Sequence, residues 1–225
     1  MAFDPFREFS MDVLCAVSSL LLVLIYYLYH AARVRRDPRY SIHYVNALAR
    51  RAWVESVMSN AGKDVMAVQT LRNFIMNAIL MVSTTTLLLI GTLTLSGQAD
   101  TISRSWHAIN LGGSHAAELW IAKVMCLLAV LLVAFFCYAL SIRLANHVLF
   151  MLNIPPDVQR QHEALAPGAV AFRLNRAGQL VAIGMRCYFF AIPLVFWLFG
   201  PLYMLAATAG VVLILSRLDR HKQGI

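Results

Sequence analysis

The stretch Val65–Ala78, V-M-A-V-Q-T-L-R-N-F-I-M-N-A, joins a basic segment to a long apolar run. A helix through this stretch places Gln69, Asn73 and Asn77 along one side, with Arg72 beside them. A polar stripe that leads into hydrocarbon is tolerated only where it faces protein, water or a ligand. The stretch therefore predicts a membrane helix that carries a binding or packing surface at its polar end.

The composition of the whole chain supports this interpretation. Of the 225 residues, 60% are hydrophobic and 13% are charged, against roughly 45–50% and 25% in soluble domains. In a soluble protein the net charge of +8 would suggest nucleic acid as a partner. Here the basic residues lie between apolar runs, where they set membrane topology. We therefore expect a membrane protein with no nucleic-acid partner.

The apolar runs predict an all-α, polytopic transmembrane helix bundle that forms a single membrane domain over residues 1–225. About five spans are expected, at approximately 13–30, 72–96, 119–149, 177–199 and 201–217. Gly200-Pro201 interrupts the last apolar stretch, so the last two spans form a hairpin. Because the final span is short, four spans plus a re-entrant hairpin is the alternative.

Two segments between the spans also have predicted structure. Ser41–Asn60 is predicted to be a cytoplasmic amphipathic helix, with Trp53 suited to the headgroup layer. Packing of this helix on the cytoplasmic end of the bundle is the alternative. A loop is expected over Asn153–Arg176, where Pro167-Gly168 is a break signal.

The distribution of Lys and Arg orients the chain. With the N-terminus outside, the inner segments 30–70, 150–176 and 217–225 hold thirteen Lys and Arg residues. The outer segments hold two, Arg7 and Arg104. The positive-inside rule therefore predicts a multi-pass protein of the inner (cytoplasmic) membrane, with its N-terminus outside and its C-terminus in the cytoplasm.

Polar residues on three predicted helices gather on the cytoplasmic side. Arg143, Asn146 and His147 are spaced i, i+3, i+4 and share one helix face. Arg186 lies deeper in its span, and an Arg at the centre of a span costs at least about 2.5–3.5 kcal/mol on insertion scales. The candidate ligand-binding residues are Arg186, Arg143, Arg72, Asn73, Gln69, His147, Asn146 and Asn77.

This cluster of arginines needs a counter-charge, because carboxylates occur only at the margins of the spans. Asp64, Glu55 or Asp219 could fold back, helix-end carbonyls could bind the guanidinium groups, or an anion could come from outside the chain. One interpretation is a pocket for an anionic group such as a lipid phosphate or a carboxylate metabolite. The other is a network of snorkelling Arg side chains that only ties the helices together.

Other kinds of chemistry have little support. The four cysteines lie in apolar runs without CxxC spacing, as is typical of helix-packing residues. In the outer loop His107, His115 and Glu118 form a weak metal candidate, since only the last two are spaced i, i+3. Paired acid and base groups, nucleotide motifs and a bis-histidine haem pattern are missing. We expect no catalytic residues and no cofactor, and an enzyme is the least favoured class.

Several strings resemble those of one membrane family. They are Arg51-Ala52-Trp53-Val54 with Met58, A-V-Q-T-L-R-N at 67–73, Ser141-Ile142-Arg143 with Asn146-His147, G-M-R-C-Y-F at 184–189, and Pro193, Trp197 and Gly200-Pro201. Together they resemble an uncharacterised family of bacterial and plant integral membrane proteins, domain of unknown function 599, over nearly the whole chain. Phe74 stands where the resemblance leads us to expect a small residue, and Cys187 where alanine is expected. The resemblance implies a multi-pass membrane fold and no established activity.

These observations predict a protein that binds, or moves, a small anionic solute or lipid headgroup at the cytoplasmic half of the bundle. Arg186 and Arg143 would supply the charge. The alternative is a structural or assembly protein whose polar cluster only locks helices or subunits together. Membrane lipids with anionic headgroups are the expected partners. A homo-oligomer is also expected, because Ala206-x-x-x-Gly210 permits close helix contact.

Overall fold

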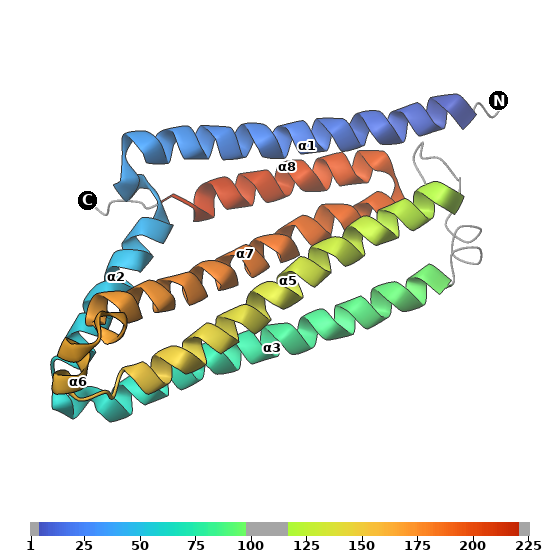
Figure 1. Ribbon diagram of the computed structural model, residues 1–225. Helices are drawn as coiled ribbons and strands as arrows, with labels where there is room; N and C mark the ends of the chain where they lie inside the picture. Colours follow the sequence, from blue (N-terminus) through green and yellow to red (C-terminus); the bar gives the residue numbers. More distant parts are fainter. Residues whose placement is uncertain (1–4, 98–116, 221–225) are drawn as a thin grey trace. The chain divides into compact units, whose positions relative to one another are not determined.

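A computed structural model describes residues 5–97 and 117–220 (Figure 1). All the regular elements in these ranges are helices, which confirms the predicted all-α class. They are α1 (Pro5–Arg36), η1 (Pro38–Tyr40), α2 (Ile42–Met58), η2 (Ala61–Lys63), α3 (Asp64–Gly97), α5 (Ala117–Met151), α6 (Pro156–Gln161), η3 (Glu163–Leu165), α7 (Pro167–Phe199) and α8 (Pro201–Leu218).

Five helices in the described part of the chain are long and apolar enough to cross a membrane: α1, α3, α5, α7 and α8. Their number matches the five predicted spans. The 34 residues of α3 extend about 51 Å at 1.5 Å per residue, whereas the hydrocarbon core is about 30 Å thick. The α3, α5 and α7 helices are therefore long enough to continue past their apolar portions as polar ends.

The loop predicted over Asn153–Arg176 is wrong for most of its length. Residues 156–165 form α6 and η3, and α7 begins at Pro167, ten residues before the predicted span. Proline at the first position of a helix loses no hydrogen bond, because that N–H has no partner within the helix. The backbone N–H groups of Ala169 and Val170 instead bond to the carbonyl of Ala166. Pro167 therefore starts a helix here, where the sequence suggested a break.

The helix predicted over Ser41–Asn60 is confirmed as α2. The side chain of Ser41 caps it by accepting a hydrogen bond from the backbone N–H of His43, at 3.3 Å. Val54 and Val57 are buried in one cluster with residues of α3, α5 and α7. The buried face of α2 therefore packs on other helices, which is one of the two arrangements that the sequence left open.

The chain falls into two compact units. Unit 1 comprises Met1–Tyr40, Leu87–Leu132 and Arg186–Ile225, and unit 2 comprises Ser41–Thr86 and Val133–Met185. The α3, α5 and α7 helices each contribute residues to both units.

In unit 1, α1 lies beside α8 (Figure 1). Tyr26 of α1 packs with Val211 and Leu215 of α8, and two further clusters join α5 to the part of α7 in this unit. The hairpin between α7 and α8 turns at Gly200, whose φ of 151° side chains rarely adopt. Pro201 then starts α8.

In unit 2, α2 and the adjoining parts of α3, α5 and α7 share one core. Its buried residues are Val54, Val57, Ala67, Leu71, Val148, Leu152, Val170, Ala171 and Leu174. The ring of the buried Tyr138 lies directly against Gly184, where a Cβ atom would lie 2.7 Å from Tyr138 Cζ. Ser141 on α5 donates a hydrogen bond of 2.9 Å to the carbonyl of Ala177 on α7.

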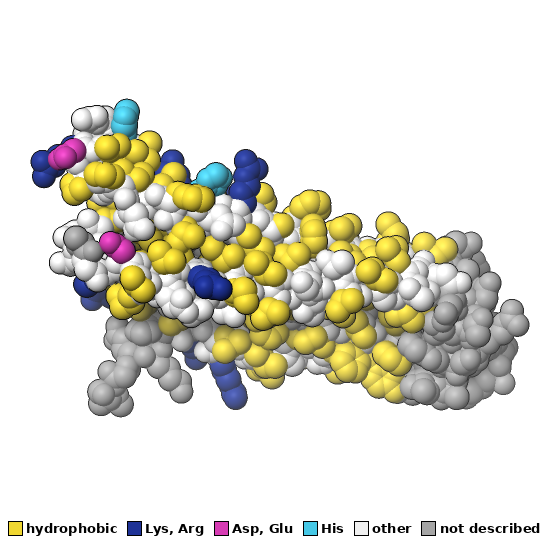
Figure 2. All heavy atoms as spheres, turned by 90° about the horizontal axis from the view of Figure 1, so that it is seen from below, with side chains coloured by type: hydrophobic (Ala, Val, Ile, Leu, Met, Phe, Trp, Pro, Cys, Tyr) yellow, Lys and Arg dark blue, Asp and Glu magenta, His cyan; other side chains and the backbone are white. Residues whose placement is uncertain are grey.

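Large apolar side chains occupy much of the surface, as Figure 2 shows for one face. Leu20 and Leu87, for example, are each 70% exposed although they lie in the middle of long apolar helices. In water, an apolar surface of this extent would make molecules of the protein associate with one another. A hydrocarbon environment accommodates it.

Candidate functional site

In unit 1, Arg186 has a counter-ion from its own chain. Its Nη2 atom donates to Oδ1 of Asp219 at 2.9 Å and to Oδ2 at 2.8 Å. The hydroxyl of Tyr26 also donates to Oδ2, and the guanidinium lies 5.6 Å from the centre of the Tyr27 ring. Asp219 is therefore the counter-charge, one of the three carboxylates that the sequence left open.

This ion pair connects three helices. Arg186 comes from α7, Tyr26 from α1, and Asp219 caps the C-terminus of α8, where its backbone N–H bonds to the carbonyl of Leu215 at 2.9 Å. The carboxylate side chain is only 8% exposed. An anionic ligand at Arg186 would have to compete with a buried carboxylate that already makes charge-assisted hydrogen bonds.

A second buried ion pair in unit 1 was missed in the sequence analysis. Lys123 Nζ lies 2.9 Å from Asp12 Oδ1, and the side chains are 6% and 0% exposed. Trp197 Nε1 donates to the same oxygen at 2.9 Å, and Lys123 Nζ lies 5.4 Å from the centre of the Trp197 indole. A usable signal was present, because Asp12 and Lys123 are opposite charges near the ends of two spans predicted to start on the same side.

The polar stripe of α3 lies on an exposed face in unit 2. Gln69, Asn73 and Asn77 are exposed. Leu71, which faces the core, is two residues from Asn73 and hence about 200° away around the helix. Arg72 is also exposed. The stripe therefore points away from the interior of this unit.

The polar face of α5 is exposed in the same way. Arg143, Asn146 and His147 share one exposed face, while Ala145 and Val148 are buried. Seven of the eight candidate residues thus lie on outward faces of unit 2, and the eighth, Arg186, belongs to unit 1. Ligand binding by these residues stays a prediction.

Unit 2 carries an excess of positive charge. Its two segments hold eight Lys and Arg residues and four Asp and Glu residues. Glu55 pairs with Arg51 at 3.0 Å. Arg72, Arg143 and Arg176 are exposed and have no ion-pair partner among residues 5–97 and 117–220.

Arg50 of α2 is held in a fixed position against α7. Its Nε donates to Oδ1 of Asn175 at 2.8 Å, and Asn175 Nδ2 in turn donates to the carbonyl of Ala47 at 3.3 Å. The guanidinium lies so close to α7 that a Cβ atom at position 178, which is Gly178, would be 2.8 Å from Arg50 Cζ. Burial lowers the pKa of the Arg50 guanidinium. In the described part of the chain no carboxylate pairs with it.

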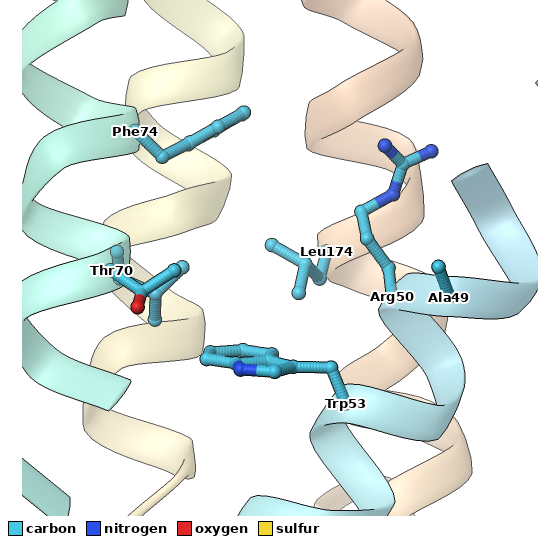
Figure 3. Close-up of a pocket in the computed structure, with 7 residues that line it drawn as sticks. Ala49, Arg50, Trp53, Thr70, Phe74 and Leu174 are labelled. Carbon is cyan, nitrogen blue, oxygen red and sulfur yellow. The ribbon is translucent and has the colours of Figure 1, made fainter. Parts of the chain in front are cut away.

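Arg50 lies at the edge of a pocket within unit 2 (Figure 3). The pocket has a volume of about 290 Å³, near the lower limit of roughly 300–1,000 Å³ that is usual for ligand sites. The remaining lining residues are Ala49, Trp53, Thr70, Leu71, Phe74 and Leu174. Figure 3 shows the side chains of Trp53 and Leu174 reaching into the space between α3 and α2. The sequence pattern pointed to Trp53 as a residue suited to the headgroup layer and gave no signal for a pocket.

The weak metal candidate falls largely outside the described residues. His107 and His115 lie there, and only the backbone of Glu118 is described. Within residues 5–97 and 117–220, no group of three or more His, Cys, Asp or Glu residues is arranged to hold a metal ion.

Five long apolar helices, an apolar surface and ion pairs buried between helices define a polytopic α-helical membrane protein. The chain belongs to the family described as "Protein of unknown function, DUF599", whose model matches residues 14–223. This confirms the resemblance seen in the sequence strings. No curated protein and no solved structure matches the chain.

Proposed function

We propose that this chain is a protein of the inner membrane that binds anionic lipid headgroups at its cytoplasmic end, through the basic surface of unit 2. The observation that carries this proposal is the set of three exposed arginines, Arg72, Arg143 and Arg176, without acidic partners in the described residues. Anionic phospholipids, such as phosphatidylglycerol, are the partner class with the complementary charge.

The position of the three arginines along their helices supports a headgroup ligand. Arg72 comes two residues before Phe74, where the apolar portion of α3 begins, and Arg176 directly precedes the apolar portion of α7. Arg143 comes three residues after Leu140, where the apolar portion of α5 ends. Side chains at the ends of apolar spans reach the headgroup layer.

The expected strength of this binding is moderate. A Lys or Arg near an anionic membrane surface contributes about 1 kcal/mol, so three together contribute about 3 kcal/mol, or roughly a hundredfold in affinity. Arg186 is left out of this surface, because Asp219 already balances its charge. The positive-inside rule supports the orientation, with the N-terminus outside and the C-terminus in the cytoplasm.

Lipid retention measured by native mass spectrometry tests the proposal. The protein is released from nanodiscs that contain phosphatidylglycerol and phosphatidylcholine in equal amounts. The wild type should retain phosphatidylglycerol preferentially, and combined Arg72→Gln, Arg143→Gln and Arg176→Gln substitutions should remove most of that preference. Arg51→Gln is the control, because Arg51 is exposed but paired with Glu55. Equal retention of both lipids by the wild type would contradict the proposal.

A structural or assembly role is the second candidate, and the position of Asn77 favours it. This residue lies within the apolar portion of α3 and is exposed, and its amide makes no hydrogen bond to the described residues. An unsatisfied amide in hydrocarbon is costly, so contact with a second copy of the chain would stabilise it.

Gly210 allows a test of this second candidate. A Cβ atom there would have no atom within 4 Å in the described chain. Gly210→Ile should therefore leave the monomer folded. If Ala206-x-x-x-Gly210 forms a contact between copies, the variant should lower the mass measured by light scattering in detergent. An unchanged mass, equal to that of a monomer in both proteins, would exclude the homo-oligomer.

A further inference from the structure

Four exposed residues form a seam along the part of α3 that lies in unit 2. Asn73, Asn77, Leu80 and Thr84 follow one another at spacings of four, three and four residues, and all four are exposed. This is the spacing of the a and d positions of a heptad repeat, at which two helices stay in contact along their length. Leu71, which enters the core of unit 2, lies on roughly the opposite side of α3. The α3 seam is therefore available to a partner helix.

The chemistry of the α3 seam suits a second helix better than lipid. The amide of Asn77 lies within the apolar portion of α3 and makes no hydrogen bond to residues 5–97 and 117–220. Hydrocarbon offers no partner to this amide, so leaving it there is costly. Interfaces between membrane helices are rich in small and polar residues, and asparagine amides bond across them. The hydroxyl of Thr84 already donates to the carbonyl of Leu80 at 2.9 Å, so Thr84 adds a compact side chain whose donor is satisfied.

A second copy of this chain supplies the complementary surface. All copies enter the membrane with the same topology, so the α3 helices of two neighbours run parallel. In a parallel pair related by a two-fold axis, each residue of the seam faces the same residue of the partner. One Asn77 amide can then donate to the amide oxygen of the other, because a carboxamide is both donor and acceptor. Thr84 is β-branched at position a and Leu80 occupies position d, the combination that favours two helices.

We infer that two copies of this chain associate in the membrane through the α3 seam, with their Asn77 amides hydrogen-bonded to each other. This inference rests on the assembly role given as the second candidate function, because it names the surface and the partner for that role. Arg72, which the first proposal assigns to lipid binding, lies about 100° around the helix from Asn73 and outside the seam. The dimer therefore leaves Arg72 open to lipid headgroups.

Single-molecule photobleaching of the full chain, labelled at its C-terminus and reconstituted in large vesicles, tests the inference by counting the copies in each complex. The wild type should bleach in two steps. Asn77→Leu should raise the protein-to-lipid ratio at which half of the protein is dimeric by about tenfold, as expected for one hydrogen bond between membrane helices. Asn77→Gln keeps a carboxamide and should stay close to the wild type. Thr86→Leu is the matched control, because Thr86 is also exposed but lies about 180° from Asn77 around α3.

Disulfide formation between copies tests the register of the α3 seam. Two cysteines can be bridged only when their Cα atoms lie within about 7 Å, as two residues at the same d position do. Leu80→Cys should therefore give a covalent dimer on mild oxidation. Ile79→Cys, one residue earlier and on another face of α3, should give no more dimer than the wild type with its own four cysteines. Both positions are exposed, so the two variants differ in the face they label.

The outcomes separate the α3 seam from the other proposals. A dimer that survives Asn77→Leu but is lost in Gly210→Ile would place the contact on α8, and would overturn this inference while keeping the assembly role. A wild type that bleaches in one step at every protein-to-lipid ratio would overturn both. Equal cross-linking of Leu80→Cys and Ile79→Cys would also overturn the inference. Lipid binding is judged separately, because retention of phosphatidylglycerol is measured with the arginine variants.

Discussion

Arg186 and Asp219 form an ion pair across 33 residues of sequence, in which one guanidinium nitrogen donates to both carboxylate oxygens at 2.9 and 2.8 Å. The pair joins α7 to the end of α8, and the Tyr26 hydroxyl of α1 binds the same carboxylate. The chain thus neutralises its most deeply placed arginine with its own carboxylate. Exposed arginines without an ion-pair partner in residues 5–97 and 117–220, among them Arg72, Arg143 and Arg176 of unit 2, are accessible to an external anion.

Asp219→Asn should lower the stability of the protein. The substitution leaves Arg186 largely buried without its counter-ion, and breaking a buried pair from one side costs about 3–5 kcal/mol. Because the Arg186 side chain is 23% exposed, we expect the free energy of unfolding to fall by about 3 kcal/mol, the lower end of this range. Unfolding by sodium dodecyl sulfate in mixed micelles measures it.

The same experiment has a matched control. Arg51→Gln removes an exposed ion pair to Glu55 one helical turn away, and such pairs contribute about 0.3–0.5 kcal/mol. Arg186→Gln combined with Asp219→Asn should be less destabilising than the sum of the single substitutions. Additive effects would show that the two groups do not interact.

Trp197→Phe and Lys123→Met should separate the two contacts of Asp12. Phenylalanine keeps an aromatic face beside Lys123 but removes the Nε1–H that donates to the carboxylate, so a loss of about 1.5–3 kcal/mol is expected. Lys123→Met leaves a fully buried carboxylate without its cation, which should cost about 3–5 kcal/mol. Thermal unfolding in detergent measures the loss of stability of each variant. A smaller loss for Lys123→Met than for Trp197→Phe would contradict this prediction.

Three glycine substitutions should differ according to what surrounds each glycine. Gly184→Ala places a Cβ atom 2.7 Å from the ring of Tyr138, which is itself fully buried, so about 1–3 kcal/mol should be lost by overpacking. Gly178→Ala meets only the guanidinium of Arg50, which can move away by giving up its hydrogen bond to Asn175, and should cost less than Gly184→Ala. At Gly91 nothing lies within 4 Å in the described chain, so Gly91→Ala should not destabilise. Melting temperatures of the three variants provide the comparison, and equal losses would be inconsistent with this packing.

The orientation of the chain can be tested with a reporter at its C-terminus. Green fluorescent protein becomes fluorescent in the cytoplasm but not after export in unfolded form across the inner membrane. Fused after Ile225, it should therefore fluoresce, because the inner segments hold thirteen Lys and Arg residues against two in the outer ones. Alkaline phosphatase at the same position should be inactive, and the reverse pair of results would invert the proposed topology.

The spans could be read from the sequence because the signal for a membrane helix is local. About 20 consecutive apolar residues cross the hydrocarbon whatever lies beside them, and α3, α5, α7 and α8 all contain their predicted spans. The family also follows from strings such as A-V-Q-T-L-R-N, and the family model confirms it. The segment before α7 was misjudged: α6 and η3 lie in the predicted loop, and α7 begins at Pro167. A proline that ends one segment is equally suited to start the next.

The sequence alone therefore determined the all-α class, the five long apolar helices, the amphipathic helix and the family. Tertiary structure decided which charges meet. Asp12 pairs with Lys123, 111 positions away, and Asn175 fixes Arg50 from another helix. The rotation of a helix about its axis and its choice of neighbours depend on packing between helices, which residue spacing within one helix does not encode. For that reason the polar stripe of α3 could be found in the sequence, but not the face toward which it points.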